Sequence, residues 1–295
     1  MFAFAILWQD YVASNNPGSA IASVAGIGAP SKVWDALRSE HQRRSMEAEA
    51  NQNYAGARLE REIKLIVGHE PAAFLSNVYS NAFMDDLNLV LFPLLQRYSP
   101  YTPYLDQLNA TWLDNKGSQF LVFDGSAIDG RHPWTETPAT WAEVYRWYNT
   151  RTLGAHNLLL QRRLAPRFTH FEPLVHLTAH FGEDLTMPAS ADPVFWTMRC
   201  PLSRTGKLRA LVARVLPVMM DVTGTDGRTR SFRVLLPVLG APSLGTYLPS
   251  NLAEFAEVFS ERDGRDFSVA KLEFRSLGKS AYRQDCEAEF LRALP

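Results

Sequence analysis

The order of apolar runs along the chain changes near residue 165, and this change constrains the fold more than any other feature. Before it, short apolar runs alternate with longer segments of helical periodicity, an order typical of an α/β layer. After it, short alternating runs are separated by Pro, Gly and Asp, which favours an antiparallel β-sandwich or jelly roll. We therefore predict an α+β chain of two domains, an α/β domain over residues 31–164 and a β-sandwich over residues 165–295.

The first half can be divided into expected elements. Ser31 is expected to cap a helix whose apolar face holds Val33, Trp34 and Leu37. A further helix carries Leu59, Ile63 and Ile66, and the charged run between the two is interpreted as a solvated face. Strands are expected at residues 72–77, 88–96, 119–124 and 156–163. Two more helices are expected, one capped by Thr102 with Leu105, Leu108 and Trp112 on its apolar face, and one starting at Thr137-Pro138 and covering residues 139–149.

The second half is expected to be almost entirely strand. The clearest hairpin has Asp226-Gly227 at its turn, a pair that tolerates left-handed backbone. One helix is expected, at residues 251–261. The expected strands are residues 175–181, 194–200, 217–223, 230–237, 267–274 and 286–294.

Charge and cysteine content narrow the classes of partner and site. The 295 residues include 30 Lys and Arg and 31 Asp and Glu, so no basic excess is present and we expect no nucleic-acid partner. The two cysteines, Cys200 and Cys286, are too few for a structural zinc site or a disulfide framework. They form either one disulfide in an oxidising compartment or two buried thiols.

In residues Gln119–Pro133, an apolar run that is expected to be a strand leads into a loop rich in Asp, Gly, Arg and His. This loop is the first place to look for a site, because ligands often lie at the carboxyl ends of strands. In a catalytic interpretation, Asp129 or His132 acts as acid or base and Arg131 holds an anionic group, with Asp124 completing the site. In the structural interpretation, which we favour, the aspartates and glycines shape turns and the cations pair with the carboxylates.

Other catalytic and metal-binding patterns fail on spacing. The loop at residues 124–132 lacks the second acid of phosphate-transferring hydrolases and the flanking glycines of a nucleophile elbow. The sequence also has no Gly-rich, phosphate-cradling loop followed by Lys-Ser or Lys-Thr. His176 and His180 alternate with apolar residues, which favours a strand that separates them by roughly 13 Å, too far for one ion. On a helix they would share a face with Glu172. We expect neither a metal nor a cofactor.

Three segments together resemble the extracytoplasmic part of large, multi-spanning bacterial envelope proteins that are described as glycosyltransferase-like. They are YSPYTPYLDQLNATWL, FLVFDGSAIDGRHP and PATWAEVYRWY, and the resemblance covers residues 98–148 best. In that family a bundle of spanning helices precedes this region. The apolar start of residues 1–30 is too short to cross a bilayer, so we interpret it as the stub of the last spanning helix; a buried first element and an atypical signal are the alternatives.

The resemblance implies an extracytoplasmic module that binds or scaffolds in a membrane-linked envelope glycan or glycolipid process. Its expected partners are a carbohydrate or glycolipid and, through an N-terminal helix, the membrane. The expected ligand-binding side chains are those of Tyr98, Tyr101, Tyr104 and Trp134, and Trp196 or Tyr247 would serve the sandwich if they are exposed. The alternatives are a hydrolase or transferase with its site at residues 124–132, and a purely structural interaction module.

Overall fold

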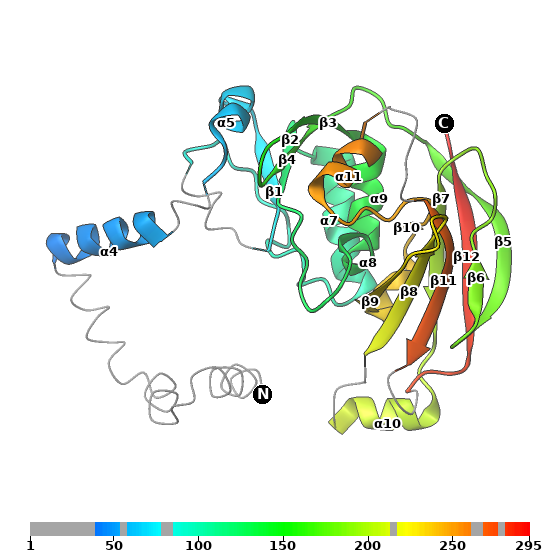
Figure 1. Ribbon diagram of the computed structural model, residues 1–295. Helices are drawn as coiled ribbons and strands as arrows, with labels where there is room; N and C mark the ends of the chain where they lie inside the picture. The colour runs from blue at the N-terminus through cyan, green and yellow to red at the C-terminus, as the bar shows by residue number, and fades with distance from the viewer. Residues whose placement is uncertain (1–38, 54–57, 78–84, 213–216, 261–267, 277–280) are drawn as a thin grey trace. The chain divides into compact units, whose positions relative to one another are not determined.

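The computed structural model describes residues 39–53, 58–77, 85–212, 217–260, 268–276 and 281–295 (Figure 1). Over these residues the chain is a mixed α+β protein with seven α-helices and three four-stranded, mostly antiparallel sheets. The chain divides into two units, residues 1–57 and residues 58–295. The expected stub at residues 1–30 and the expected helix after Ser31 lie outside the described residues.

The first unit contains one described helix, α4 (Glu40–Asn53). It is polar, and Glu40 pairs with Arg44 one turn later at 2.6 Å. The charged run predicted to be a solvated face is indeed helical and exposed wherever its exposure is described. No helix among the described residues of either unit is long and apolar enough to span a lipid bilayer.

The first sheet of the second unit has both faces covered. Its strand order is β1-β2-β4-β3, with β1 and β2 parallel and the other pairs antiparallel. Phe120 and Val122 pack toward α5 (Arg61–Val67), whereas Leu121 and Phe123 pack toward the central helices, as strand alternation requires. The strands are β1 (Ala72–Leu75), β2 (Phe120–Phe123), β3 (Tyr148–Leu153) and β4 (Leu158–Arg162).

The second and third sheets share a core in the second half of the chain. The second sheet has the order β10-β7-β12-β5 and the third has the order β6-β11-β8-β9. Trp196 of the second sheet meets Phe274 of the third, ring centroid to ring centroid, at 5.5 Å. The strands are β5 (His170–His180), β6 (Asp184–Thr186), β7 (Val194–Arg199), β8 (Val218–Gly224), β9 (Thr229–Val234), β10 (Ser243–Leu244), β11 (Val269–Ser276) and β12 (Asp285–Leu294).

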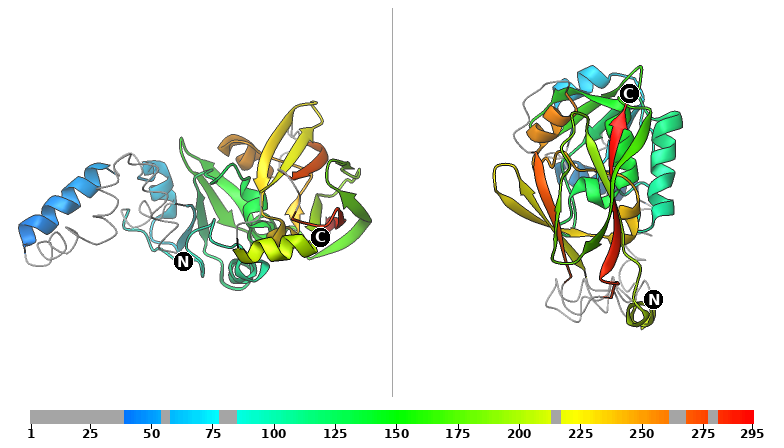
Figure 2. Two further views of the ribbon diagram at one scale, coloured as in Figure 1. Left: turned by 90° about the horizontal axis from the view of Figure 1, so that it is seen from below. Right: turned by 90° about the vertical axis from the view of Figure 1, so that its right-hand side faces the viewer.

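A second core joins sequence from both sides of residue 165. Successive residues of β7 point to opposite faces, so Trp196 enters the core between the sheets while Phe195 enters the core under the central helices. There Phe195 meets Tyr145 at 5.9 Å between ring centroids, and Phe123 meets Phe255 at 4.9 Å. Two views of the ribbon show the helices between the first sheet and the other two (Figures 1 and 2). The helices are α7 (Pro103–Lys116), α8 (Pro133–Glu136), α9 (Pro138–Trp147) and α11 (Leu252–Val258).

Many expected elements are present. Strands cover most of residues 72–77, 119–124 and 156–163, and Thr102 caps α7 with Pro103 in its first turn. The hairpin between β8 and β9 turns at Asp226-Gly227, where Gly227 has φ of +80°.

Four expectations about elements are wrong. Residues 88–96 form no strand beyond a single bridge at Leu89, because Pro93 has no N–H to donate and the run leaves Leu91 and Leu95 exposed. The helix expected over residues 139–149 ends at Trp147, and β3 follows immediately. Helix α10 (Arg204–Val212) and the short 3-10 helix η2 (Leu236–Gly240) lie where strands and loops were expected.

The buried face of α7 was also predicted incorrectly. Leu105, Leu108 and Trp112 are only partly buried. The face that packs inward instead carries two polar residues, which no apolar pattern reveals. Its buried residues are Asp106, Asn109, Ala110 and Leu113.

Candidate functional site

Asp124 stands where β2 ends, beside the end of its parallel neighbour β1. Its carboxylate accepts a hydrogen bond from the Ser76 hydroxyl, which follows β1. It also accepts from Ser126, from the backbone N–H at 2.9 Å and from the hydroxyl at 2.7 Å. Both carboxylate oxygens are therefore used to join two strand ends and to close a turn, in which Gly125 takes φ of +71°.

Asp129 and Gly130 form a left-handed turn at the tip of the loop, with φ of +57° and +66°. The Asp129 carboxylate lies 3.3 Å from the Arg131 guanidinium and 3.4 Å from that of Arg233 on β9. The backbone N–H of Arg233 donates to the carbonyl of Gly130 at 2.8 Å. The tip is thus attached to the third sheet by one backbone hydrogen bond and one ion pair, both made by Arg233.

Beneath the loop lies a buried ion cluster of Arg97, Arg131 and Glu136. The Glu136 carboxylate is 3.2 Å from the Arg97 guanidinium and 3.7 Å from that of Arg131. Burial raises the pKa of Glu136, and the two guanidinium groups oppose that rise. Arg97 also donates to the carbonyl of Ser126 and lies over the ring of Phe123. Through these contacts of Arg97, the cluster attaches the loop to the core.

His132 is a buried member of the aromatic core rather than an exposed acid or base. Its Nδ1 accepts from the backbone N–H of Trp134 at 3.2 Å, so it caps α8. Its Nε2 lies 2.8 Å from the carbonyl oxygen of Pro249, and since that oxygen can only accept, Nε2 carries the proton. Burial lowers the pKa of His132 to about 4. The ring stacks on Phe255 at 5.9 Å between centroids.

The four predicted catalytic residues therefore divide into separate places. Asp129 and Arg131 are in contact, whereas Asp124 serves the strand ends and His132 points toward Pro249. None of the four lines either of the two larger depressions described below. Each of the four side chains has a defined protein partner, and these contacts attach the loop to the strand ends, to the third sheet and to the core.

The predicted ligand-binding aromatics also divide. Trp134 is 2% exposed and packs in the core, where it offers no surface to a ligand. Trp196, named as a sugar-binding side chain only if exposed, is 3% exposed and belongs to the core, and Tyr247 is partly buried. Tyr98 is partly exposed. Tyr101 is 50% exposed, and its ring lies 5.6 Å from the Arg131 guanidinium. Tyr104 is 70% exposed and lies on the outer face of α7.

An open depression of about 400 Å³ runs along the outer face of α7. Its residues recur every three or four positions, so they form one stripe of the helix. Trp112 rests against the buried ring of Phe92, 4.7 Å between centroids, which fixes the indole in place. The residues of this α7 stripe are Tyr104, Gln107, Leu108, Thr111, Trp112, Asn115 and Lys116.

A second depression, of about 710 Å³, adjoins the first and shares Gln107 with it. Its lining comes from the start of α7, from η2 and the residues after it, and from the ends of β7 and β12. Four of its residues are prolines, and its charged side chains are Arg199 and Glu287. The lining residues of this proline groove are Pro103, Gln107, Met198, Arg199, Cys200, Pro201, Leu236, Pro237, Gly240, Ala241, Pro242 and Glu287.

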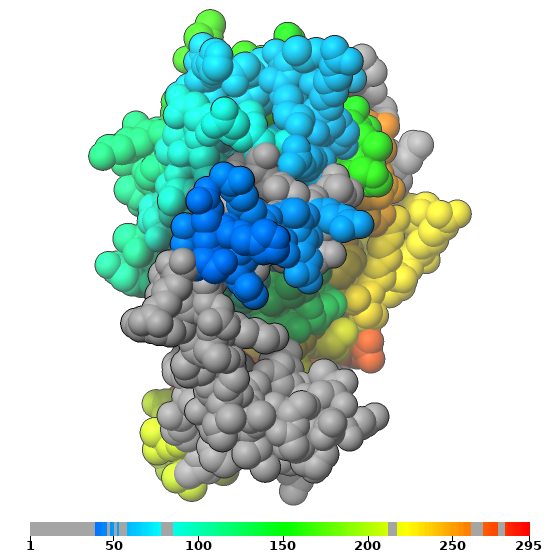
Figure 3. Space-filling view, turned by 90° about the vertical axis from the view of Figure 1, so that its left-hand side faces the viewer, coloured from blue at the N-terminus to red at the C-terminus, as the bar shows by residue number. Residues whose placement is uncertain are grey.

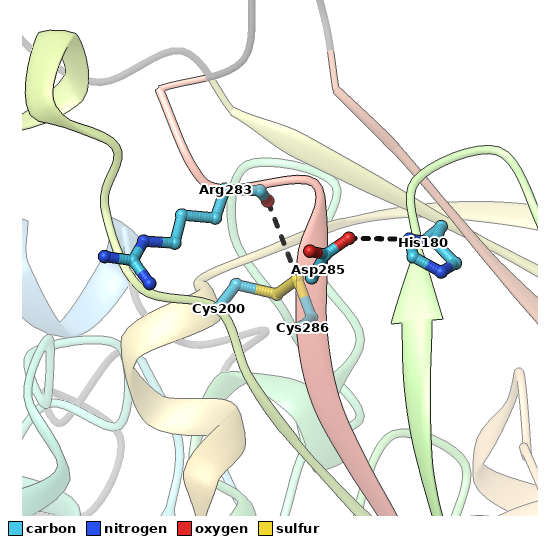
Figure 4. Close-up of a disulfide and its surroundings, with 5 residues drawn as sticks. All are labelled: His180, Cys200, Arg283, Asp285 and Cys286. Atoms are coloured by element: carbon cyan, nitrogen blue, oxygen red, sulfur yellow. Dashed lines mark hydrogen bonds and ion pairs between the residues drawn. A yellow bond between two sulfur atoms is a disulfide. The ribbon is translucent and has the colours of Figure 1, made fainter.

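A disulfide joins Cys200, which lines the proline groove, to Cys286 (Figure 4). It links β7 to β12, which pair antiparallel with Arg199 opposite Glu287. Beside it, His180 of β5 lies 3.1 Å from Asp285. Of the two alternatives left open by the sequence, the structure has the disulfide.

The histidines considered as metal ligands lie on a strand. His176 and His180 are both part of β5. Among the described residues, no group of three or more His, Cys, Asp or Glu side chains is arranged to hold a metal ion.

Three residues that organise the site region were not predicted. Arg97 and Glu136 are charged residues in segments that otherwise look apolar or turn-like, and nothing in their spacing shows that they meet. Asp106 could have been suspected, because the segment that starts α9 reads Thr-Pro-Ala-Thr. The side chain of its N-cap residue, Thr137, forms no capping hydrogen bond, so the first turn of α9 needs an acceptor from another segment. The chain matches no protein-family model and no curated protein.

Proposed function

We propose that this chain is an extracytoplasmic binding module that serves a membrane-linked envelope glycan or glycolipid process. The α7 stripe is the observation that carries the proposal. It presents two aromatic side chains, Tyr104 and Trp112, beside the amides of Gln107 and Asn115 in one open depression. Aromatic faces pack against the C–H faces of sugar rings, and amides both donate to and accept from hydroxyl groups.

The size and order of the α7 stripe support binding. Its volume of about 400 Å³ lies within the range of about 300 to 1,000 Å³ found for small-ligand sites. Trp112 is held by Phe92, and Asn115 donates to the Thr111 carbonyl of its own helix at 3.0 Å. A stripe on a helix of 14 residues is also more rigid than a loop. Little ordering entropy would thus oppose binding.

The location outside the cytoplasm is supported by the disulfide. Structural disulfides form and persist mainly in oxidising compartments. The bond between Cys200 and Cys286 joins positions 86 residues apart in the sequence. Attachment to the membrane through a helix near residues 1–30 is part of the proposal and rests on the family resemblance alone.

For the finer architecture, we propose an α/β layer in the first half followed by a jelly-roll-like sandwich in the second. The core between the second and third sheets supports the sandwich. The parallel pair β1 and β2, joined through α7, supports the α/β layer. The core shared by Phe123, Tyr145, Phe195 and Phe255 makes the two parts one folding unit in this proposal.

The experiment is a titration of the full chain, with its disulfide oxidised, against oligosaccharides released from bacterial envelopes. The Tyr104→Ala variant is expected to weaken binding about tenfold, because it removes a ring that stacks on the sugar. Leu65→Ala is the matched control, since Leu65 is 73% exposed on α5, at the face of the molecule shown in Figure 3. Equal affinities for the parent and Tyr104→Ala would count against the α7 stripe.

A further inference from the structure

The proline groove contains the guanidinium group of Arg199. Arg199 is exposed, and it forms no ion pair or hydrogen bond with any residue that the structure describes. Its cross-strand partner is Glu287, also exposed, but the two side chains form no ion pair within 4.0 Å. An arginine that lies directly opposite a carboxylate on a neighbouring antiparallel strand can form a stabilising ion pair with it. Here the guanidinium donors stay available to a ligand.

The Arg199 side chain lies beside Gly240 at the end of η2. A Cβ added at Gly240 would lie 3.6 Å from Arg199 Nε and 3.7 Å from its Cγ. The side chain therefore runs across the bare backbone of Gly240, at the end of η2. The cation therefore lies on the η2 side of the groove.

The other polar groups of the groove complement a saccharide that carries an anion. A guanidinium presents five donors in a planar fork that matches a carboxylate or a phosphate. Glu287 can accept from sugar hydroxyl groups, and Gln107 can both donate and accept. The prolines, among them Pro103, Pro237 and Pro242, supply apolar surface without losing rotamer freedom. A few polar groups placed on an apolar lining are the usual plan of a ligand site, and here Arg199 is the cation among them and Glu287 the carboxylate.

The two depressions adjoin at Gln107, which lines both. A ligand longer than one sugar can therefore occupy the α7 stripe with one residue and the proline groove with the next. We propose that the chain recognises an acidic glycan, with neutral sugar rings on Tyr104 and Trp112 and a carboxylate or phosphate substituent on Arg199. This inference rests on the proposed function and adds the chemical class of the ligand.

The test compares three probes on the full oxidised chain by calorimetric titration. Tetragalacturonate carries carboxylates, a neutral galactose tetrasaccharide of equal length carries none, and a mannose tetrasaccharide phosphorylated at C6 of one ring carries a phosphate. We expect the parent chain to bind an acidic probe about fivefold more tightly than the neutral one, and to lose that preference as salt is raised. Whichever acidic probe binds more tightly identifies the anion as carboxylate or phosphate.

Arg199→Gln is the deciding variant, and Arg151→Gln is its control. Arg151 is an exposed arginine on β3, outside both depressions, so its replacement changes the net charge equally. Arg199→Gln is expected to bind the acidic and neutral probes equally, while Arg151→Gln behaves like the parent. If Arg199→Gln keeps the full acidic preference, this inference is overturned and the proposed function stands. If the parent chain binds no saccharide, both this inference and the proposed function are overturned.

Discussion

The carboxylate of Asp106 on α7 caps α9, the helix that packs beside it, at Thr140. It accepts from the backbone N–H groups of Ala139 at 2.8 Å and Thr140 at 3.0 Å, and from the Thr140 hydroxyl at 2.6 Å. These N–H groups belong to the first turn of α9, which has no capping bond from its own Thr137. Because α7 also carries the candidate binding stripe, this bond positions the stripe relative to the core.

Asp106→Ala should lower the free energy of unfolding by about 2 to 3 kcal/mol, since it removes a helix cap and leaves buried N–H groups without an acceptor. Thr140→Ala removes only one of the three bonds and should cost about 1 kcal/mol. Urea unfolding at neutral pH measures both. Equal and small losses for the two variants would contradict the capping role.

We predict that the contribution of His132 to the free energy of unfolding falls as the pH is lowered. Its pKa of about 4 in the folded chain lies below its ordinary 6.5, so the unfolded chain binds the proton more tightly. Stability from this residue is complete above pH 6.5 and declines as pH falls toward about 4, by about 1.4 kcal/mol per pH unit at most. Burial raises the pKa of Asp106 to about 6 from 3.8, so Asp106 acts in the opposite direction.

His132→Asn isolates the histidine contribution, because Asp106 is unchanged in both proteins. The difference in unfolding free energy between parent and variant should shrink by about 2 kcal/mol from about pH 7 to about pH 5. His176→Asn, at an exposed position on β5, is the control and should leave the pH profile as in the parent. A constant difference between parent and His132→Asn across that range would show that His132 titrates normally.

Glu136→Gln should destabilise the chain by about 3 to 5 kcal/mol, because it leaves the buried Arg97 and Arg131 without their shared carboxylate. Glu143→Gln is the matched control. Glu143 pairs with Arg146 at 3.5 Å at a partly exposed position, so its loss should cost less than about 1 kcal/mol. Denaturant midpoints compare the two, and similar midpoints would mean that the buried cluster contributes little.

Reduction of the disulfide should lower the free energy of unfolding by about 4 kcal/mol, as expected for a bond that closes a loop of 86 residues. Thermal unfolding with and without dithiothreitol measures the change. The double variant Cys200→Ser, Cys286→Ser should unfold at the temperature of the reduced parent and should not respond to dithiothreitol. A parent that is equally stable in both conditions would show that the bond does not form in solution.

The sequence predicts those elements whose pattern is local. The strands β7 and β12, the cap at Thr102 and the turn at Asp226-Gly227 depend on neighbouring residues, and each is found in the structure. Residues 88–96 look like a strand from composition alone, but pairing requires a neighbouring strand edge and unbroken N–H donors, which Pro93 interrupts.

The candidate site could be located only in part. The loop after β2 was found from its chemistry, but its role depends on partners far away in sequence. Arg233 lies 104 residues from Asp129, and Pro249 lies 117 residues from His132. In the sequence, Tyr104 and Trp134 were equivalent aromatic candidates. Only the structure shows that Trp134, on α8, packs against Phe255 and is buried, whereas Tyr104 is exposed.

We propose that the chain binds a glycan on α7, and we expect the loop at residues 124–132 to support the fold. The most direct test measures the affinity of Tyr104→Ala and Asp129→Asn for the same envelope oligosaccharide, with urea midpoints to confirm folding. We predict that Tyr104→Ala loses about tenfold in affinity while Asp129→Asn binds as the parent does. Normal binding by Tyr104→Ala together with lost binding by a folded Asp129→Asn would contradict the account and place the site in the loop.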